Sequence, residues 1–333
     1  MVQTRKSVDR TGLIFRVLAV ASLVAAFAQV TLGGIVRVTG SGLGCPDWPL
    51  CHGQLIPPFE FATLIEYSHR LSASVLGVLV LGTTIVVMMR YRPNRWGKNS
   101  VLTALALVIV AAILGGATVL TELAWWLRLL HLGIAEGVVA ALIIAVVVSW
   151  RVSGNATANV AVTESNGLSK WTIAALVGVF LLILSGSYIV GAGYGSSCGT
   201  WPLCRGSLFP EGRPYIEHMA HRYFAAIVGV LVIAVAYSAW KSPKLPSVGR
   251  TGFLLLVVFA AQILVGALTV WLGFTAEIKA IHLSMATLVW IALVFVAALS
   301  YVPQRFADAD AVLGHRESAA VDGMNAGGLK GRA

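Results

Sequence analysis

Long apolar runs alternate with short polar segments along the whole chain, and eight of the runs are long enough to cross a membrane. A spanning helix needs about 20 consecutive, mostly apolar residues. The runs lie at 13–36, 65–89, 101–120, 129–150, 171–190, 218–240, 251–272 and 281–302. The pattern therefore predicts an all-α integral membrane protein with eight transmembrane helices.

Composition supports this prediction, because 58% of the 333 residues are hydrophobic and only 11% are charged. That leaves too little polar surface to cover a water-soluble globule. The net charge of +10 would suit nucleic-acid binding, but the basic residues are placed differently. All but seven of the 24 Lys and Arg residues lie in the N-terminal segment, in the segments that join even helices to odd ones, or after 302.

This distribution follows the positive-inside rule. It predicts a multi-pass protein of the cell membrane with both termini in the cytoplasm, and it implies no nucleic-acid partner. The basic residues left for the outer face are Arg37, Arg70, Arg128, Arg205, Arg213, Arg222 and Lys279.

Two segments of the chain are near copies of each other, at an offset of 153 residues: 40–53 (GSGLGCPDWPLCHG) and 193–206 (GYGSSCGTWPLCRG). A similar offset carries His69 onto His221 and His131 onto His282. The repeat indicates an internal duplication of a four-helix unit. Because four is an even number, the two halves should enter the membrane in the same direction and form tandem four-helix bundles related by a pseudo-two-fold axis along the membrane normal.

The repeat also divides the chain. We expect a cytoplasmic N-terminal segment, an N-terminal half, a flexible cytoplasmic linker, a C-terminal half and a disordered cytoplasmic tail that contains few large apolar residues. These parts cover residues 1–12, 13–151, 152–170, 171–302 and 303–333.

One histidine stands near the outward start of each even helix, namely His69, His131, His221 and His282. A single histidine at a membrane interface is more often a polar anchor than a ligand. Independent anchors, however, would have no reason to recur once per even helix in both halves, and ionisable groups in membrane segments are usually functional. The pattern indicates two hemes, one per half, each with an iron held between two imidazoles.

Charged residues accompany these histidines. Arg70 and Arg222 directly follow two of them and suit either heme propionates or lipid headgroups. Glu66 lies one helical turn before His69 and suits proton transfer, orientation of the imidazole, or a solvated interfacial position. Its aligned position in the second half is His218, and no role is assigned to His218 or to Glu136.

All four cysteines form two pairs in outward loops, Cys45 with Cys51 and Cys198 with Cys204. The even count and the oxidising compartment favour one disulfide in each loop. A structural bridge and a redox-active one remain open, and zinc is the weaker alternative because the spacing differs from that of zinc knuckles. Gly33, Gly115, Gly186 and Gly266 near the outer ends of the odd helices favour close helix packing over close approach to a ligand.

The first cysteine loop, the run Glu66-Tyr67-Ser68-His69-Arg70 and the single histidine of each other even helix resemble the heme A synthase family. This resemblance covers nearly the whole membrane portion. It implies oxidation of the C8 methyl group of heme O to a formyl group by successive hydroxylations, in the assembly of respiratory terminal oxidases. It further implies that His69 and His131 flank the substrate heme O, that His221 and His282 hold a heme b, and that Glu66 is catalytic.

The resemblance also matches Cys45 and Cys51 to a pair in the family's first loop, whereas Cys198 and Cys204 match a pair that only some members have. The second loop departs from the first, since Gly199 and Thr200 replace Pro46 and Asp47. Membrane lipid, a heme O synthase and a quinol or other electron donor are the candidate partners.

Three other functions fit parts of the pattern. A diheme, quinol-linked membrane cytochrome needs the four histidines but neither Glu66 nor the cysteine loops. A membrane thiol/quinone oxidoreductase would depend on the cysteines first. A transporter would suit parallel repeats, but the even helices have no break at their centres.

Overall fold

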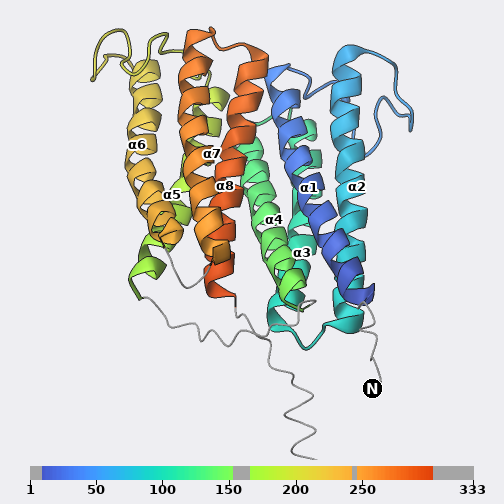
Figure 1. Cartoon of the computed structure of the whole chain (residues 1–333). Coiled ribbons are helices and arrows are strands. Elements are labelled where there is room, and N and C mark those ends of the chain that lie inside the picture. Colours follow the sequence, from blue (N-terminus) through green and yellow to red (C-terminus); the bar gives the residue numbers. More distant parts are fainter. Residues whose placement is uncertain (1–9, 153–165, 242–245, 303–333) are drawn as a thin grey trace, which may run out of the picture.

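The computed structural model describes residues 10–152, 166–241 and 246–302, and these residues form eight α-helices (Figure 1). The N-terminal half contains α1 (Arg10–Val38), α2 (Phe61–Arg90), α3 (Arg95–Leu120) and α4 (Trp125–Val152). The C-terminal half contains α5 (Asn166–Gly191), α6 (Arg213–Trp240), α7 (Pro246–Trp271) and α8 (Ala276–Tyr301). All eight helices are long and apolar enough to cross a membrane, which confirms the predicted multi-pass membrane protein.

Most helices extend beyond the apolar runs that predict them, because polar residues and aromatic rings near a membrane surface continue a helix without entering the hydrocarbon. The even helices begin four or five residues earlier than expected. His69 and His221 are therefore the ninth residues of α2 and α6, and His131 and His282 are the seventh residues of α4 and α8. The histidines lie about two turns inside their helices, deeper than the positions near the helix starts that the sequence suggested.

The expected linker is shorter than predicted, since α4 continues to Val152 and α5 already begins at Asn166. The rest of it, 153–165, lies outside the described residues, as do 1–9 and the expected disordered tail 303–333. Helix α1 begins, and α8 ends, at the same side of the helix layer, opposite the long α1–α2 and α5–α6 loops (Figure 1).

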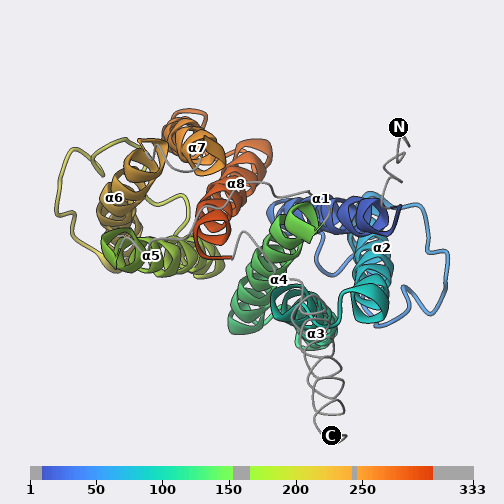
Figure 2. The same cartoon turned by 60° about the horizontal axis from the view of Figure 1, so that its bottom comes forward.

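Helix contacts divide the protein into two bundles, α1–α4 and α5–α8, which lie side by side (Figure 2). Within the first bundle α1 packs on α2 and α4, and α3 packs on α2 and α4; within the second, α5 and α7 each pack on α6 and α8. The halves meet where α8 contacts α1 and α4, and where α4 contacts α5. The two halves are built alike, as the internal repeat predicts.

Polar contacts tie the two halves together inside this apolar interface. The Thr287 hydroxyl of α8 donates to Oε1 of Glu136 on α4 at 2.7 Å, and the Trp290 indole N–H donates to the Glu136 backbone carbonyl at 3.0 Å. Glu136 is fully buried. Because a buried polar group is stable only when it is paired, these bonds fix how α4 and α8 face each other. Glu136, which the sequence left without a role, therefore lies in the interface between the halves.

Candidate functional site

Each of the four histidines packs against a glycine on the preceding helix. A Cβ built on Gly33 would lie 3.0 Å from Cε1 of His69, and the other three glycines would meet their histidines in the same way. The corresponding separations are 3.3 Å for Gly115 and His131, 3.1 Å for Gly186 and His221, and 3.2 Å for Gly266 and His282. The small residues thus make room for the imidazole rings, in agreement with the close helix packing favoured from the sequence.

Three of the imidazoles also have a polar side chain from the odd helix at Nδ1. Gln29 Nε2 lies 3.1 Å from Nδ1 of His69, Ser185 Oγ lies 2.7 Å from Nδ1 of His221, and Gln262 Nε2 lies 3.4 Å from Nδ1 of His282. For His221 and His282, a partner at one ring nitrogen fixes the tautomer and leaves the other free for a metal, whereas Gln29 Nε2 also lies 3.3 Å from Nε2 of His69.

For His282 the same contact has a second consequence. Oε1 of Gln262 is buried without a hydrogen-bond partner among the described residues. Turning this amide by half a rotation would let Oε1 accept the Nδ1 proton of His282, which satisfies both groups and leaves Nε2 bare.

The histidines interact in pairs within each half. The charge of His69 would interact with that of His131, and the charge of His221 with that of His282. Among the described residues, no group of three or more His, Cys, Asp or Glu side chains is placed to hold a metal ion by itself. Each half therefore offers two imidazoles, each packed against a glycine. Two imidazoles are the protein ligands that an iron porphyrin needs, since the porphyrin supplies the other four ligands.

The α1–α2 and α5–α6 loops each contain the predicted cysteine pair. Cys45 is disulfide-bonded to Cys51 and Cys198 to Cys204, and all four are buried. In this state no thiolate is available for zinc. The first loop also contacts α3, because the Trp48 ring lies 2.8 Å from the position of a Cβ on Gly116, so the loop reaches across the end of its bundle.

Arg70 and Arg222 hold these loops in place. Arg70 donates from NH1 to the carbonyl oxygens of Asp47 and Leu50 at 2.7 and 2.8 Å, and from NH2 to that of Cys45 at 2.9 Å. Arg222 donates to the carbonyls at the three aligned positions, Thr200, Leu203 and Cys198, at 2.8, 3.2 and 3.2 Å. These contacts give the two arginines a loop-anchoring role that the sequence did not suggest, and they lend no support to the prediction that the same groups bind propionates.

The departure between the two loops does not change how they fold. Asp47 accepts from the backbone N–H of His52 at 2.6 Å and of Gly53 at 2.8 Å, and the Thr200 hydroxyl accepts from the N–H of Arg205 at 3.0 Å. A hydroxyl thus closes the second turn where a carboxylate closes the first. The bond from Gly53, with a smaller effect from His52, lowers the pKa of Asp47 below its ordinary value.

Glu66 is buried and paired, with 6% of its surface exposed. Its Oε1 accepts from Nε of Arg70 at 3.0 Å. In the second half, Nε2 of His218 lies 3.5 Å from NH2 of Arg222. The same arginine position therefore contacts a carboxylate in one half and an imidazole in the other, which makes the cysteine-loop ends of the two bundles chemically different.

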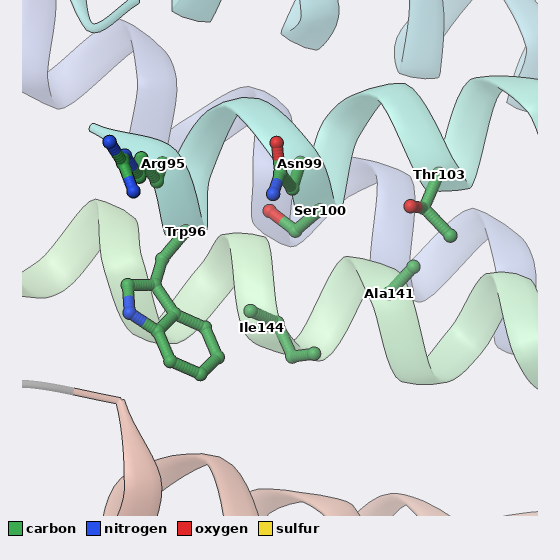
Figure 3. Close-up of a pocket in the computed structure, with 7 residues that line it drawn as sticks. All are labelled: Arg95, Trp96, Asn99, Ser100, Thr103, Ala141 and Ile144. Atoms are coloured by element: carbon green, nitrogen blue, oxygen red, sulfur yellow. The ribbon is translucent and has the colours of Figure 1, made fainter. Parts of the chain in front are cut away.

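A separate pocket lies between α3 and α4 near the end of the helices opposite the histidines, and none of the expected site residues lines it (Figure 3). Its lining comprises Arg95, Trp96, Asn99, Ser100 and Thr103 of α3 with Ala141 and Ile144 of α4.

Comparison with known proteins shows the family of this chain. The COX15-CtaA family, described as cytochrome oxidase assembly protein, matches residues 16–60 and 58–294. The chain belongs to this family.

Curated relatives of the family member include the heme A synthase of Exiguobacterium sibiricum, which is 27% identical over 275 residues, or 80% of this chain and 90% of the relative. The heme A synthase of Macrococcus caseolyticus is 27% identical over 79% of this chain and 89% of the relative. That of Staphylococcus carnosus is 28% identical over 78% and 85%. The family match supports the resemblance first drawn from the loop and histidine motifs.

Sequence reasoning did not find the polar partners of the histidines, Gln29, Ser185 and Gln262. Two of them carry a usable signal, since Gln29 and Gln262 are polar residues inside apolar helices, four residues before Gly33 and Gly266.

Proposed function

We propose that this family member is a heme A synthase, an oxidoreductase that converts the C8 methyl group of heme O to a formyl group by successive hydroxylations and loss of water. The observation that carries the proposal is the pairing of two glycine-seated histidines in each half, His69 with His131 and His221 with His282. The relatives named heme A synthase, which align over most of their own length, support the reaction class.

Within this proposal the N-terminal half takes the substrate, with His69 and His131 on the two faces of heme O. His221 and His282 hold a heme b, which supplies one-electron redox chemistry when bound. The difference between the halves supports the assignment, because Glu66 is buried at the position that His218 holds in the C-terminal half, whereas Glu217, four residues before His221, is partly exposed and lies 3.6 Å from Arg213. His218 at the equivalent position cannot provide a negative charge.

Glu66 is the proposed catalytic residue. Burial keeps water away from its carboxyl group, and the bond from Arg70 holds Oε1 toward the cysteine loop. A carboxyl group held in this way accepts or donates a proton at a fixed position beside the substrate. Arg70 thereby links the disulfide loop to the proton-transfer group, and the loop itself excludes water from the outward end of the bundle.

The distribution of basic residues supports an orientation with both termini in the cytoplasm and with the histidines and disulfides toward the outer face of the cell membrane. Lipid surrounds the helices, and a heme O synthase and a quinol are the proposed partners that deliver substrate and electrons.

Heme extraction tests the proposed reaction. The full chain is purified from cells with and without a heme O supply, and its hemes are separated by chromatography alongside a reduced-minus-oxidised spectrum. Hydroxylated heme O or heme A that appears only with heme O supports the synthase. Heme b alone under both conditions would instead support a diheme cytochrome, and a colourless protein would overturn the four-histidine site.

A second experiment tests Glu66. The Glu66→Gln variant should retain bound heme and lose product, whereas Glu217→Gln, which removes a half-exposed carboxylate of the other half, should turn over normally. Normal turnover by Glu66→Gln would remove this residue from the mechanism.

A further inference from the structure

Basic residues on the outward side of a membrane protein need an explanation, because positive charge is usually avoided there. Most of them have a partner. Arg70 and Arg222 bind the loops, Arg213 lies 3.6 Å from Glu217, and Arg205 lies over the Tyr215 ring. Neither of the two salt bridges found among the described residues involves Arg37 or Arg128.

Arg37 lies in the last turn of α1, at the interface with the C-terminal half. Its NH1 donates to the Ser187 hydroxyl at 2.7 Å and its NH2 to the Ser187 carbonyl at 2.5 Å. NH2 of Arg37 also lies 3.4 Å from the position of a Cβ on Gly191. Its Nε is buried and has no hydrogen-bond partner among the described residues. One donor of a firmly held guanidinium is therefore unused.

Arg128 on α4 is in the same condition. Its Nε is buried without a partner in the described part of the chain, and its charge acts directly on that of Arg37. Two neighbouring like charges repel each other, and the Nε atom of each guanidinium is shielded from water. An anion between or beside them would relieve both effects and use both Nε donors.

The depth of the two arginines indicates which anion this is. Arg37 follows Gly33, the seat of His69, by four residues, and Arg128 precedes His131 by three residues. The backbone positions of both arginines thus lie about one helical turn outward of the level of His69 and His131. A heme held at the imidazole level carries its two carboxylates along one edge, within reach of this outward position.

We propose that Arg37 and Arg128 bind the propionates of the heme held between His69 and His131. The proposal rests on the proposed function, since it requires a heme in the N-terminal half. A guanidinium matches a carboxylate in shape and charge, and the pair would orient the porphyrin edge outward. The C-terminal half lacks such a pair, because the positions aligned with Arg37 and Arg128 are Val190 and Lys279. The pair therefore distinguishes the substrate half from the other half.

Heme titration of the full chain in detergent tests this assignment. The probes are ferric heme b as the free acid and ferric heme b as its dimethyl ester. Binding to the N-terminal half is measured as the part of the absorbance change that is absent in the His69→Ala variant. The wild type should bind the free acid at least about tenfold more tightly than the ester, because each charged hydrogen bond contributes about 1.5–3 kcal/mol. Arg37→Gln and Arg128→Gln should weaken free-acid binding and lose this preference, with little change for the ester.

The matched control is Lys279→Gln, which removes an outward cation of the second half and should keep the preference. A variant that retains the part of the spectrum removed by His221→Ala is folded and can be interpreted. His69-dependent binding with an unchanged free-acid preference in both arginine variants would overturn this inference alone. If the two arginine variants keep the free-acid preference but no longer co-purify with an anionic phospholipid, the arginines bind a lipid phosphate and the propionate assignment is wrong. No His69-dependent binding of either probe to the wild type would overturn the proposed function itself.

Discussion

Replacing Gly186 with alanine should displace His221 and weaken heme binding in the C-terminal half. The added Cβ would lie 3.1 Å from Cε1 of the imidazole. Attractive contact between carbon atoms begins at about 3.5 Å, so the ring must move by about 0.4 Å or the two helices must separate. A ligand held to an iron has little freedom to move, and Ser185 holds the same ring at Nδ1.

The size of the effect follows from the packing energetics of an added methyl group. Inserting one methyl group into a packed interior typically costs about 1–3 kcal/mol. If that strain falls on the heme-bound state, heme affinity decreases by about five- to 150-fold. The same reasoning orders the other sites: Gly33→Ala, with the shortest separation of 3.0 Å, should be more severe, and Gly115→Ala, at 3.3 Å, milder.

The assay is optical titration of each purified variant with heme b, together with the position of its Soret band. Gly77→Ala is the control, because a Cβ on Gly77 meets nothing within 4 Å and alanine favours a helix by about 1 kcal/mol over glycine. If Gly186→Ala and Gly77→Ala bind heme with the same affinity and have the same Soret band, the argument that Gly186 makes room for a heme-ligating His221 is wrong.

Three further predictions follow from contacts elsewhere. Arg70→Gln should increase hydrogen exchange in the first cysteine loop and Arg222→Gln only in the second, because Arg70 binds three carbonyls of its own loop and Arg222 binds four. Equal protection in wild type and variants would contradict this. Thr287→Val should lower the free energy of unfolding by about 1–3 kcal/mol, because it leaves the buried Glu136 carboxyl without a hydrogen-bond partner. The control Thr269→Val removes only a bond to the Val265 carbonyl of its own helix. Identical thermal unfolding of the two variants in detergent would contradict this role of Thr287. Since the pKa of Asp47 is lowered in the folded loop, the stabilisation that its carboxylate gives is present above the unfolded pKa of about 3.9 and is lost as pH falls through the folded pKa. Hydrogen-exchange protection of the first loop should therefore decrease in acid, while that of the second loop, which is closed by the Thr200 hydroxyl, should stay constant.

The sequence predicted the helices better than their ends. The apolar runs located all eight helices, because the thickness of a bilayer sets a minimum length that few other structures need. They did not locate the N-terminal ends of the even helices, since residues such as Trp125 and Arg213 continue a helix into the headgroup region. The histidines therefore lie deeper along their helices than their distance from the apolar runs implied.

The sequence was less informative about Arg70 and Arg222. Their position beside a histidine and their charge suggested heme propionates or lipid headgroups, but their NH1 and NH2 groups bind neutral backbone carbonyls of the cysteine loops. A carbonyl oxygen belongs to every residue and leaves no trace in the sequence, so this role was not predictable. The equivalence of Asp47 and Thr200 was hidden for a related reason, because one accepting oxygen can replace another only when the backbone geometry is the same.

The sequence by itself thus determined the eight membrane spans, the duplication and the recurrence of one histidine in each even helix, because these properties depend on local composition and on repeats of local sequence. Only the tertiary structure decided which glycine seats which histidine, that Glu136 joins α4 to Thr287 of α8, and that Arg37 reaches Ser187 across 150 positions of the chain. Those contacts depend on the rotation and depth at which separate helices pack, and no single helix carries that information.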